Sequence, residues 1–106
     1  MTSKECRDVS VEEAASCILG YTAGNDLSCR VFQLPEQNGG QFFYAKAFDK
    51  FAPIGPVLIS PEIFQEGKGV KLITRVDGDV MQEAEILQDM IYSPARILSF
   101  MSQSKL

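Results

Sequence analysis

The stretch Val70–Ile86, VKLITRVDGDVMQEAEI, decides the fold of this chain. Two runs rich in β-branched and apolar residues, Val70–Val76 and Val80–Ile86, flank the dipeptide Asp77–Gly78. Asp-Gly between two such runs is a strong signal for a tight two-residue turn, because both turn positions require a positive φ. We therefore expect an antiparallel β-hairpin over this stretch.

Two glutamates on the second predicted strand, Glu83 and Glu85, form an E-x-E pair. Residues two apart on a strand point to the same face, so these carboxylates could bind a metal ion together. The favoured interpretation is the simpler one, a solvated face of the hairpin.

Short helices are predicted outside the hairpin from local capping signals. Ser10 and Glu13 form the S-x-x-E capping box that opens many helices. Ser60–Pro61 and Ser93–Pro94 each place a serine N-cap before a proline at the first helical position. Together with the hairpin, these signals predict β-structure combined with short helices. The polar residues 1–9 are expected to be disordered, and residues 10–106 to form one domain.

Composition excludes several classes of function. With 106 residues and 45% hydrophobic side chains, the chain fits a single globular domain. Its net charge of -4, without a basic cluster, argues against nucleic acid as a partner. The apolar runs are too short to cross a bilayer, so we expect no membrane partner. Three widely spaced cysteines favour reduced thiols, and hence a cytoplasmic location, over a disulfide framework, and the absence of histidine argues against a zinc site.

Asp26 is the first candidate for chemistry. Alternation along Tyr21–Phe32 would place Asp26, Ser28 and Arg30 on one face of an extended strand, and that face is too polar for a core. A carboxylate there can be a ligand for a hard cation such as Mg²⁺ or Ca²⁺. From the residues alone, a turn-capping aspartate is the favoured interpretation.

Lys46 is the second candidate, because four aromatic side chains surround it in the sequence: Phe42, Phe43, Tyr44 and Phe48. It can be a surface lysine whose stem lies on apolar side chains. It can also be a cation that faces a carboxylate or an enolate oxygen where charge develops during a reaction. Composition leaves both interpretations open.

Three segments, in order, resemble the catalytic domain of the fumarylacetoacetate hydrolase family. They are GYTAGNDLSCRVFQ (Gly20–Gln33), AKAFDKFAPIGPVLISPE (Ala45–Glu62) and RVDGDVMQEAEILQDMIYSPARILSFMSQ (Arg75–Gln103). The resemblance implies a mainly β (α+β) fold, part of that family's mixed β-sandwich roll, with short helices. Its members are metal-dependent enzymes, commonly homodimers, that use Mg²⁺, Mn²⁺ or Ca²⁺. They hydrolyse C–C bonds in, or decarboxylate, small dicarbonyl acids such as fumarylacetoacetate, acylpyruvates and oxaloacetate.

The resemblance also implies roles for single residues. Asp26 matches the metal-binding aspartate of the family's G-N-D motif, and Lys46 matches the catalytic lysine of its G-K-S-F motif. Arg30 and Gln33 match positions that reach toward the substrate. This chain departs from the second motif, which reads Ala45–Lys46–Ala47–Phe48, and it carries Lys50 where some members have a threonine near the cation.

The family's E-x-E metal pair and its histidine–glutamate dyad lie N-terminal to the segment that contains Asp26. The resemblance therefore implies an incomplete catalytic domain over residues 10–106, inactive alone and unable to hold the metal ion tightly. The alternative is a non-catalytic interaction protein that pairs with a full-length homologue. The parent enzyme would be cytoplasmic or mitochondrial.

Overall fold

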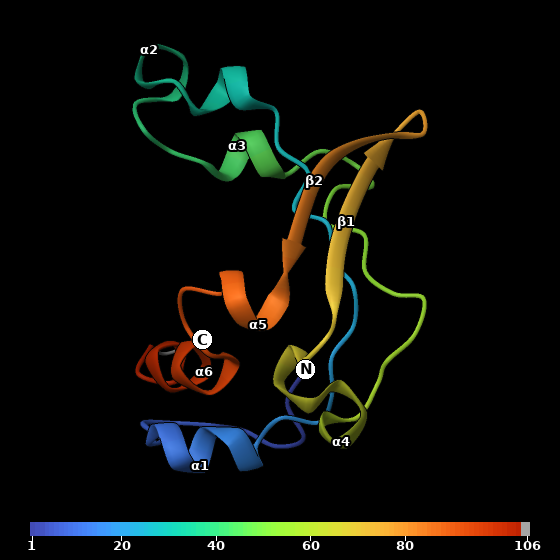
Figure 1. Ribbon diagram of the computed structural model, residues 1–106. Coiled ribbons are helices and arrows are strands. Elements are labelled where there is room, and N and C mark those ends of the chain that lie inside the picture. The colour runs from blue at the N-terminus through green and yellow to red at the C-terminus, as the bar shows by residue number, and fades with distance from the viewer. Residues whose placement is uncertain (105–106) are drawn as a thin grey trace. The chain divides into compact units, whose positions relative to one another are not determined.

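The computed structural model describes residues 1–104, except for the side chain of Asn38. The chain divides into two compact units, one formed by Met1–Tyr21 with the residues from Ile59 onward, the other by Thr22–Leu58 (Figure 1). Both units consist of short helices and extended segments, with one regular hairpin in the first unit. The prediction of an α+β chain with short helices is confirmed.

The predicted hairpin is present in the first unit. Strand β1 (Lys71–Val76) pairs antiparallel with strand β2 (Asp79–Glu85). Asp77 and Gly78 make the turn with φ values of 51° and 94°, the positive angles that a two-residue hairpin turn requires. The pairing skips Met81, which forms a bulge on β2.

The E-x-E pair on β2 lies on a charged, solvent-facing side of the hairpin. The Lys71 Nζ atom lies 2.9 Å from Glu83 Oε1 and 3.8 Å from Glu85 Oε1. The hydrogen bond to Glu83, with the charges of both glutamates, raises the pKa of Lys71. The two carboxylates therefore act as partners of a lysine on a solvated face, which is the interpretation that the sequence favours.

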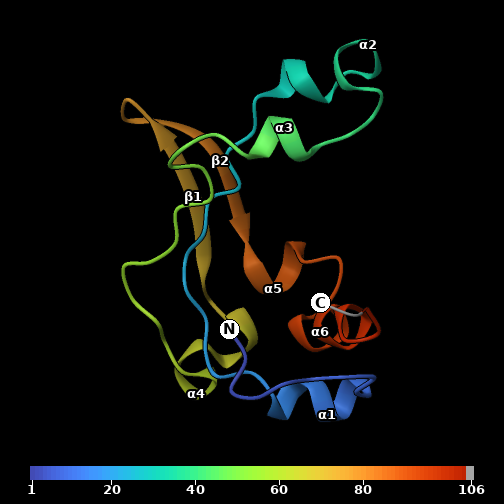
Figure 2. The ribbon, with the colours of Figure 1, turned by 180° about the vertical axis from the view of Figure 1, so that it is seen from behind.

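Two capped helices pack against each other in the same unit, as both views show (Figure 1 and Figure 2). Helix α1 (Val11–Ser16) begins with the predicted capping box: Ser10 Oγ accepts from the Glu13 N–H at 3.2 Å, and Glu13 Oε2 accepts from the Ser10 N–H at 2.9 Å. Helix α6 (Pro94–Met101) begins after Ser93, whose hydroxyl oxygen accepts from the third helical N–H.

The remaining helical turns of this unit are short. Helix α4 (Pro61–Phe64) begins with the predicted proline and continues into the 3-10 turn η2 (Gln65–Gly67). Helix α5 (Ile86–Asp89) follows β2 directly. The Tyr21 ring stacks on the buried Phe64 ring, with centroids 4.1 Å apart. This stacking anchors α4 to the segment that precedes the second unit.

Residues 1–9 make backbone contacts that their composition does not reveal. The Met1 amino group donates to the Gly20 carbonyl at 3.0 Å, and Thr2 forms an isolated β-bridge with Ile18. The Asp8 N–H donates to the Ser102 carbonyl at 3.0 Å. Disorder of residues 1–9 stays a prediction, which hydrogen exchange at these amides can test.

The second unit contains three helical turns: η1 (Arg30–Gln33), α2 (Pro35–Asn38) and α3 (Phe43–Lys46). The extended segment before them forms an isolated bridge between Gly24 and Ile54. The continuous strand predicted over Tyr21–Phe32 is wrong, because the chain enters the 3-10 turn at Arg30.

The physical reason for that change of direction lies at Cys29. Its N–H donates to the Ala45 carbonyl at 3.0 Å, and its own carbonyl accepts from the Phe32 N–H at 3.1 Å. The second bond closes the turn, so Arg30 does not share a strand face with Asp26 and Ser28.

The buried apolar core among the described residues is small: Ala14, Cys17, Ala45 and Phe64. Many large apolar side chains are instead exposed, among them Ile91 at 87% and Phe43 at 80%. Within the described residues, no helix combines the length and the apolar character that crossing a bilayer requires.

Candidate functional site

The side chain of Lys46 brings together the polar residues of the second unit. Lys46 is the last residue of α3, and its Nζ atom donates to Asp26 Oδ2 and, at 2.7 Å, to Ser28 Oγ. The Ser28 hydroxyl in turn donates to the Asp26 carbonyl at 3.0 Å. These three residues, which we call the Lys46 cluster, form a connected hydrogen-bond network.

A backbone contact explains why α3 lies beside the Asp26 segment. The Cys29 N–H donates to the Ala45 carbonyl at 3.0 Å, one residue before Lys46. Ala45 is fully buried, so the neighbouring backbone is packed tightly at this point. The Lys46 side chain is therefore directed at Asp26 and Ser28 by the packing of the residue that precedes it.

The cluster is open to solvent on its carboxylate side. The Lys46 side chain is 31% exposed, and the Asp26 side chain is 75% exposed. An ion pair with this exposure contributes no more than about 1 kcal/mol to stability, because water screens it. The Lys46 ammonium faces the carboxylate of Asp26, a contact that fits both interpretations of Lys46, the surface lysine and the catalytic cation.

Four aromatic rings from the segments around Lys46 pack together in the same unit. The Phe32 ring meets the Tyr44 ring edge-on, with centroids 4.9 Å apart. Phe48 contacts Tyr44 at 5.4 Å and Phe51 at 5.3 Å. These rings give the segments on both sides of Lys46 an apolar support.

Arg30 and Gln33, the two residues predicted to reach a substrate, form a pair of their own. The Arg30 Nη1 atom donates to Gln33 Oε1 at 2.7 Å. Both residues lie on η1, where a spacing of three positions places side chains above one another. Arg30 is exposed and Gln33 is half-buried. The Gln33 amide oxygen therefore accepts from one nitrogen of an exposed guanidinium.

The described residues do not by themselves fit a divalent cation. Among residues 1–104, no three His, Cys, Asp or Glu side chains gather in a way that could hold a metal ion. Asp26 offers a single carboxylate, and one of its oxygens already accepts from Lys46. Mg²⁺ and Ca²⁺ take about six or more oxygen ligands, so further ligands would be required.

Ser28 is the one member of the Lys46 cluster to which the sequence assigned no role. The backbone turns at Asp26, where the Leu27 N–H donates to the Asn25 carbonyl at 3.0 Å, so regular strand alternation does not account for the place of Ser28. The hydrogen bond to Lys46 spans 18 positions in the sequence, and no local signal could have predicted it.

Comparison with known proteins identifies the family. The family described as "Fumarylacetoacetate (FAA) hydrolase C-terminal" matches residues 1–106. The mitochondrial oxaloacetate tautomerase fahd2 of Xenopus laevis is 29% identical over 100 residues, which cover 94% of this chain and 31% of the relative. The chain spans about a third of the length of the curated relatives that it matches.

Two solved structures share the fold. Fumarylpyruvate hydrolase from Pseudomonas aeruginosa, in complex with Mn²⁺ and pyruvate, has 31% identity and a TM-score of 0.78, covering 96% of this chain and 43% of that one. The 5-carboxymethyl-2-hydroxymuconate delta-isomerase from Mycobacterium smegmatis has 33% identity and a TM-score of 0.76, covering 98% and 39%. The expected fumarylacetoacetase-type fold, in partial form, is confirmed. The chain belongs to the fumarylacetoacetate hydrolase family.

Proposed function

We propose that this chain is an incomplete catalytic domain, over residues 10–106, of a metal-dependent enzyme that acts on small dicarbonyl acids. The reaction is C–C bond hydrolysis or decarboxylation, with fumarylacetoacetate, an acylpyruvate or oxaloacetate as the substrate class. The observation that carries this proposal is the Lys46 cluster, in which an ammonium group is held by Asp26 and Ser28. The chain alone is inactive.

Lys46 is the catalytic residue of the proposal. Breaking a C–C bond next to a carbonyl leaves negative charge on an enolate oxygen, and a cation fixed in advance stabilises that charge. The two hydrogen bonds of its Nζ atom leave a third N–H donor for such an oxygen. An ammonium held in place needs little reorganisation when the charge develops.

Arg30 and Gln33 are proposed to bind the carboxylate of the substrate. A guanidinium presents donors in a fork that matches a carboxylate. Gln33 occupies one of these donors through its Oε1 atom and so orients the others. The dicarbonyl acids named above each carry a carboxylate that this arrangement can recognise.

Asp26 is proposed as one metal ligand of the complete site. Mn²⁺ and pyruvate in the fumarylpyruvate hydrolase structure support a divalent cation, Mg²⁺, Mn²⁺ or Ca²⁺, and a small keto acid for such a site. The single carboxylate of this cluster supports the view that the remaining ligands must come from residues outside it. A homodimer and a cytoplasmic location stay predictions, and the Xenopus laevis relative is described as mitochondrial.

Calorimetry with Mn²⁺ and an oxaloacetate turnover assay test whether the chain is incomplete. We expect neither turnover nor saturable binding tighter than about millimolar. Tighter binding that is lost in Asp26→Asn but kept in Asp49→Asn, a matched change at another exposed aspartate of this unit, would overturn the incomplete site. Turnover by the purified chain would overturn it as well.

A chimera tests the proposed catalytic role directly. Residues 20–103 of this chain replace the matching segment of the Pseudomonas aeruginosa fumarylpyruvate hydrolase, and the chimera is checked for folding and turnover. In an active chimera we expect Lys46→Met to lower kcat by about a hundredfold or more. Lys68→Met, which changes an exposed lysine of the other unit, should leave kcat unchanged. Equal activity of the two variants would contradict the role of Lys46.

The alternative function is a non-catalytic protein that pairs with a full-length homologue. The described residues contain a sheet of two strands only, so each strand of the hairpin has one edge without a strand partner. Such edges can accept a strand from another chain. Co-elution of this chain with a full-length homologue on a sizing column would favour this alternative. Failure to co-elute at tens of micromolar would count against it.

A further inference from the structure

The hydroxyl of Ser28 contacts both of the charged residues in the Lys46 cluster. Its Oγ atom accepts from Lys46 Nζ at 2.7 Å and donates to the Asp26 carbonyl oxygen at 3.0 Å. A serine hydroxyl carries one O–H donor and two acceptor lone pairs. Because a carbonyl oxygen can only accept, the single donor of Ser28 is committed to Asp26. Ser28 therefore faces Lys46 as an acceptor.

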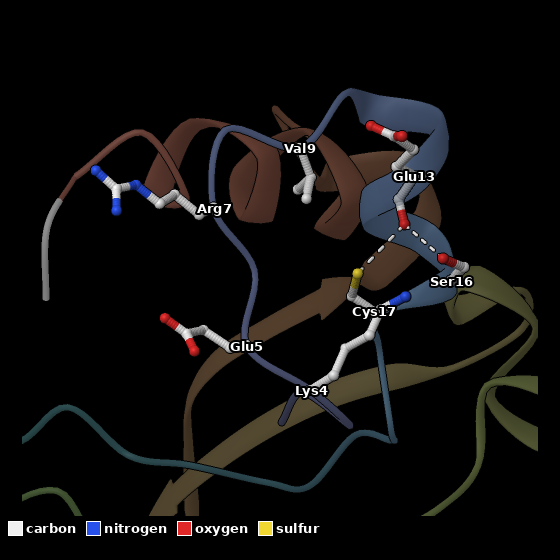
Figure 3. Close-up of a pocket in the computed structure, with 7 residues that line it drawn as sticks. All are labelled: Lys4, Glu5, Arg7, Val9, Glu13, Ser16 and Cys17. Carbon is white, nitrogen blue, oxygen red and sulfur yellow. Dashed lines mark hydrogen bonds between the residues drawn. The ribbon is translucent and has the colours of Figure 1, made fainter.

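A serine that donates to a nearby backbone carbonyl is by itself an ordinary structural feature. Figure 3 shows one at the end of α1, where the Ser16 hydroxyl donates to the Glu13 carbonyl at 2.7 Å. It lines a pocket of about 440 Å³ whose two cationic and two anionic side chains balance each other. Ser28 differs from Ser16, because the acceptor side of its hydroxyl holds an ammonium group from a residue 18 positions away in the sequence.

The backbone holds Ser28 and Lys46 close to each other. Cys29 directly follows Ser28, and its N–H donates to the Ala45 carbonyl at 3.0 Å. Ala45 in turn directly precedes Lys46 and is fully buried. Each partner of the Ser28–Lys46 contact is therefore one residue away from this backbone hydrogen bond. Ser28 is also half-buried, whereas the Asp26 side chain is 75% exposed, so Ser28 is the more rigid of the two acceptors.

Two acceptors at separate places determine where the Lys46 nitrogen lies and how its N–H bonds are oriented. An ammonium group has three N–H donors in a tetrahedral arrangement. When Asp26 Oδ2 and Ser28 Oγ each accept from one of them, the direction of the third is determined. The exposed ion pair with Asp26 alone would hold the nitrogen only weakly, because water competes for both charges.

Ser28 cannot itself stabilise negative charge on a substrate. An enolate or a carboxylate oxygen needs a hydrogen-bond donor, and the one donor of Ser28 is bonded to the Asp26 carbonyl. The remaining lone pair of the hydroxyl would repel such an oxygen. Any effect of Ser28 on the reaction must therefore pass through Lys46.

We propose that Ser28 is a positioning residue, whose hydroxyl holds the Lys46 ammonium in the orientation that stabilises an enolate oxygen. This inference rests on the catalytic role proposed above for Lys46. The negative charge on the enolate oxygen develops only as the substrate bond breaks. Loss of the Ser28 hydroxyl therefore lowers kcat and leaves KM nearly unchanged.

Nitrogen NMR relaxation of the full chain measures how firmly the ammonium is held, without any turnover. Ser28→Thr keeps the hydroxyl, and Ser28→Val has the same branched shape without it. We expect the order parameter of the Lys46 ammonium to exceed about 0.6 in the wild-type chain and in Ser28→Thr, and to fall below that value in Ser28→Val. The ammonium of the exposed Lys68, in the other unit, should stay below it throughout. An order parameter of Lys46 that Ser28→Val leaves unchanged would overturn the proposal.

The chimera with the Pseudomonas aeruginosa fumarylpyruvate hydrolase separates this inference from the proposed function. We expect Ser28→Val to have a kcat about tenfold or more below that of Ser28→Thr, the loss of one hydrogen bond to a charged group. KM should differ by less than about twofold between the two variants.

Two results of the kinetic experiment would contradict the role of Ser28 alone. Equal kcat values for Ser28→Val and Ser28→Thr, while Lys46→Met lowers kcat, would overturn the positioning role and leave the catalytic role of Lys46 intact. A loss that appears in KM instead of kcat would assign Ser28 to substrate binding and overturn the proposal as well. A Lys46→Met chimera that keeps its kcat would overturn the proposed function, and the role of Ser28 with it.

Discussion

Replacing Gly67 with alanine is expected to weaken the first unit strongly. Gly67 is buried at the end of η2 and has a φ of +85°, a value that side chains with a Cβ rarely adopt. A Cβ at this position would lie 2.5 Å from Ile86 Cγ2, 3.0 Å from Ile86 Cβ and 3.5 Å from Phe64 Cζ. The first of these distances is far below van der Waals contact, so α5 or η2 must move.

The size of the effect follows from two separate contributions. The left-handed backbone costs a residue with a Cβ about 1–2 kcal/mol. Forcing an extra carbon atom into a packed contact costs about 1–3 kcal/mol more. We therefore expect Gly67→Ala to lower the free energy of unfolding by about 2–5 kcal/mol, a large part of the roughly 5–15 kcal/mol of an ordinary domain.

Urea unfolding followed by circular dichroism measures this change, and Gly69→Ala is the matched control. Gly69 has a φ of +68°, but a Cβ there would meet nothing within 4 Å. Its substitution should therefore cost only the backbone contribution, about 1–2 kcal/mol. Adding Ile86→Ala to Gly67→Ala removes the Cγ2 atom, so the two changes together should cost less than their sum. Equal effects of Gly67→Ala and Gly69→Ala would refute the reasoning.

Three further predictions concern capping, charge and thiol chemistry. The backbone hydrogen bond from Ser10 lowers the pKa of Glu13 in the folded chain. The stability that this hydrogen bond provides is therefore present above the usual glutamate pKa, and it is lost as the pH falls through the lowered pKa of the folded chain. A carboxyl NMR titration should show this, and Ser10→Ala should destabilise the chain by about 1 kcal/mol. The pKa of Lys71 is raised in the folded chain, chiefly by its hydrogen bond with Glu83. The stability that this hydrogen bond provides is therefore present below the usual lysine pKa, and it is lost as the pH rises through the raised pKa of the folded chain. Thermal melts should show that loss, and Glu83→Gln should reduce it. Burial and the interaction with the neighbouring thiol raise the pKa of Cys6, so the rate of its exchange with glutathione disulfide should still increase with pH above the usual cysteine pKa. A rate that levels off at or below that pKa would contradict this account.

The sequence alone determined the elements whose causes lie within a few residues. The Asp77–Gly78 turn, the Ser10–Glu13 capping box and the Ser93–Pro94 helix start were all predicted, and all are present. Each depends on backbone angles or hydrogen bonds between residues at most three positions apart. The sequence also identified the family, because three segments that resemble the family's motifs occur in it in the family's order.

Tertiary structure decided which polar side chains meet. Lys46 binds Asp26, which lies 20 residues earlier in the sequence. The Cys29–Ala45 backbone hydrogen bond that brings the two segments together cannot be predicted from the residues next to either partner. A second bond of Cys29, in which its carbonyl accepts from the Phe32 N–H, closes the 3-10 turn, where Arg30 pairs with Gln33 instead of joining Asp26. Local propensity could not reveal this, because a strand face predicted from alternation exists only where neighbouring backbone supports the extended chain.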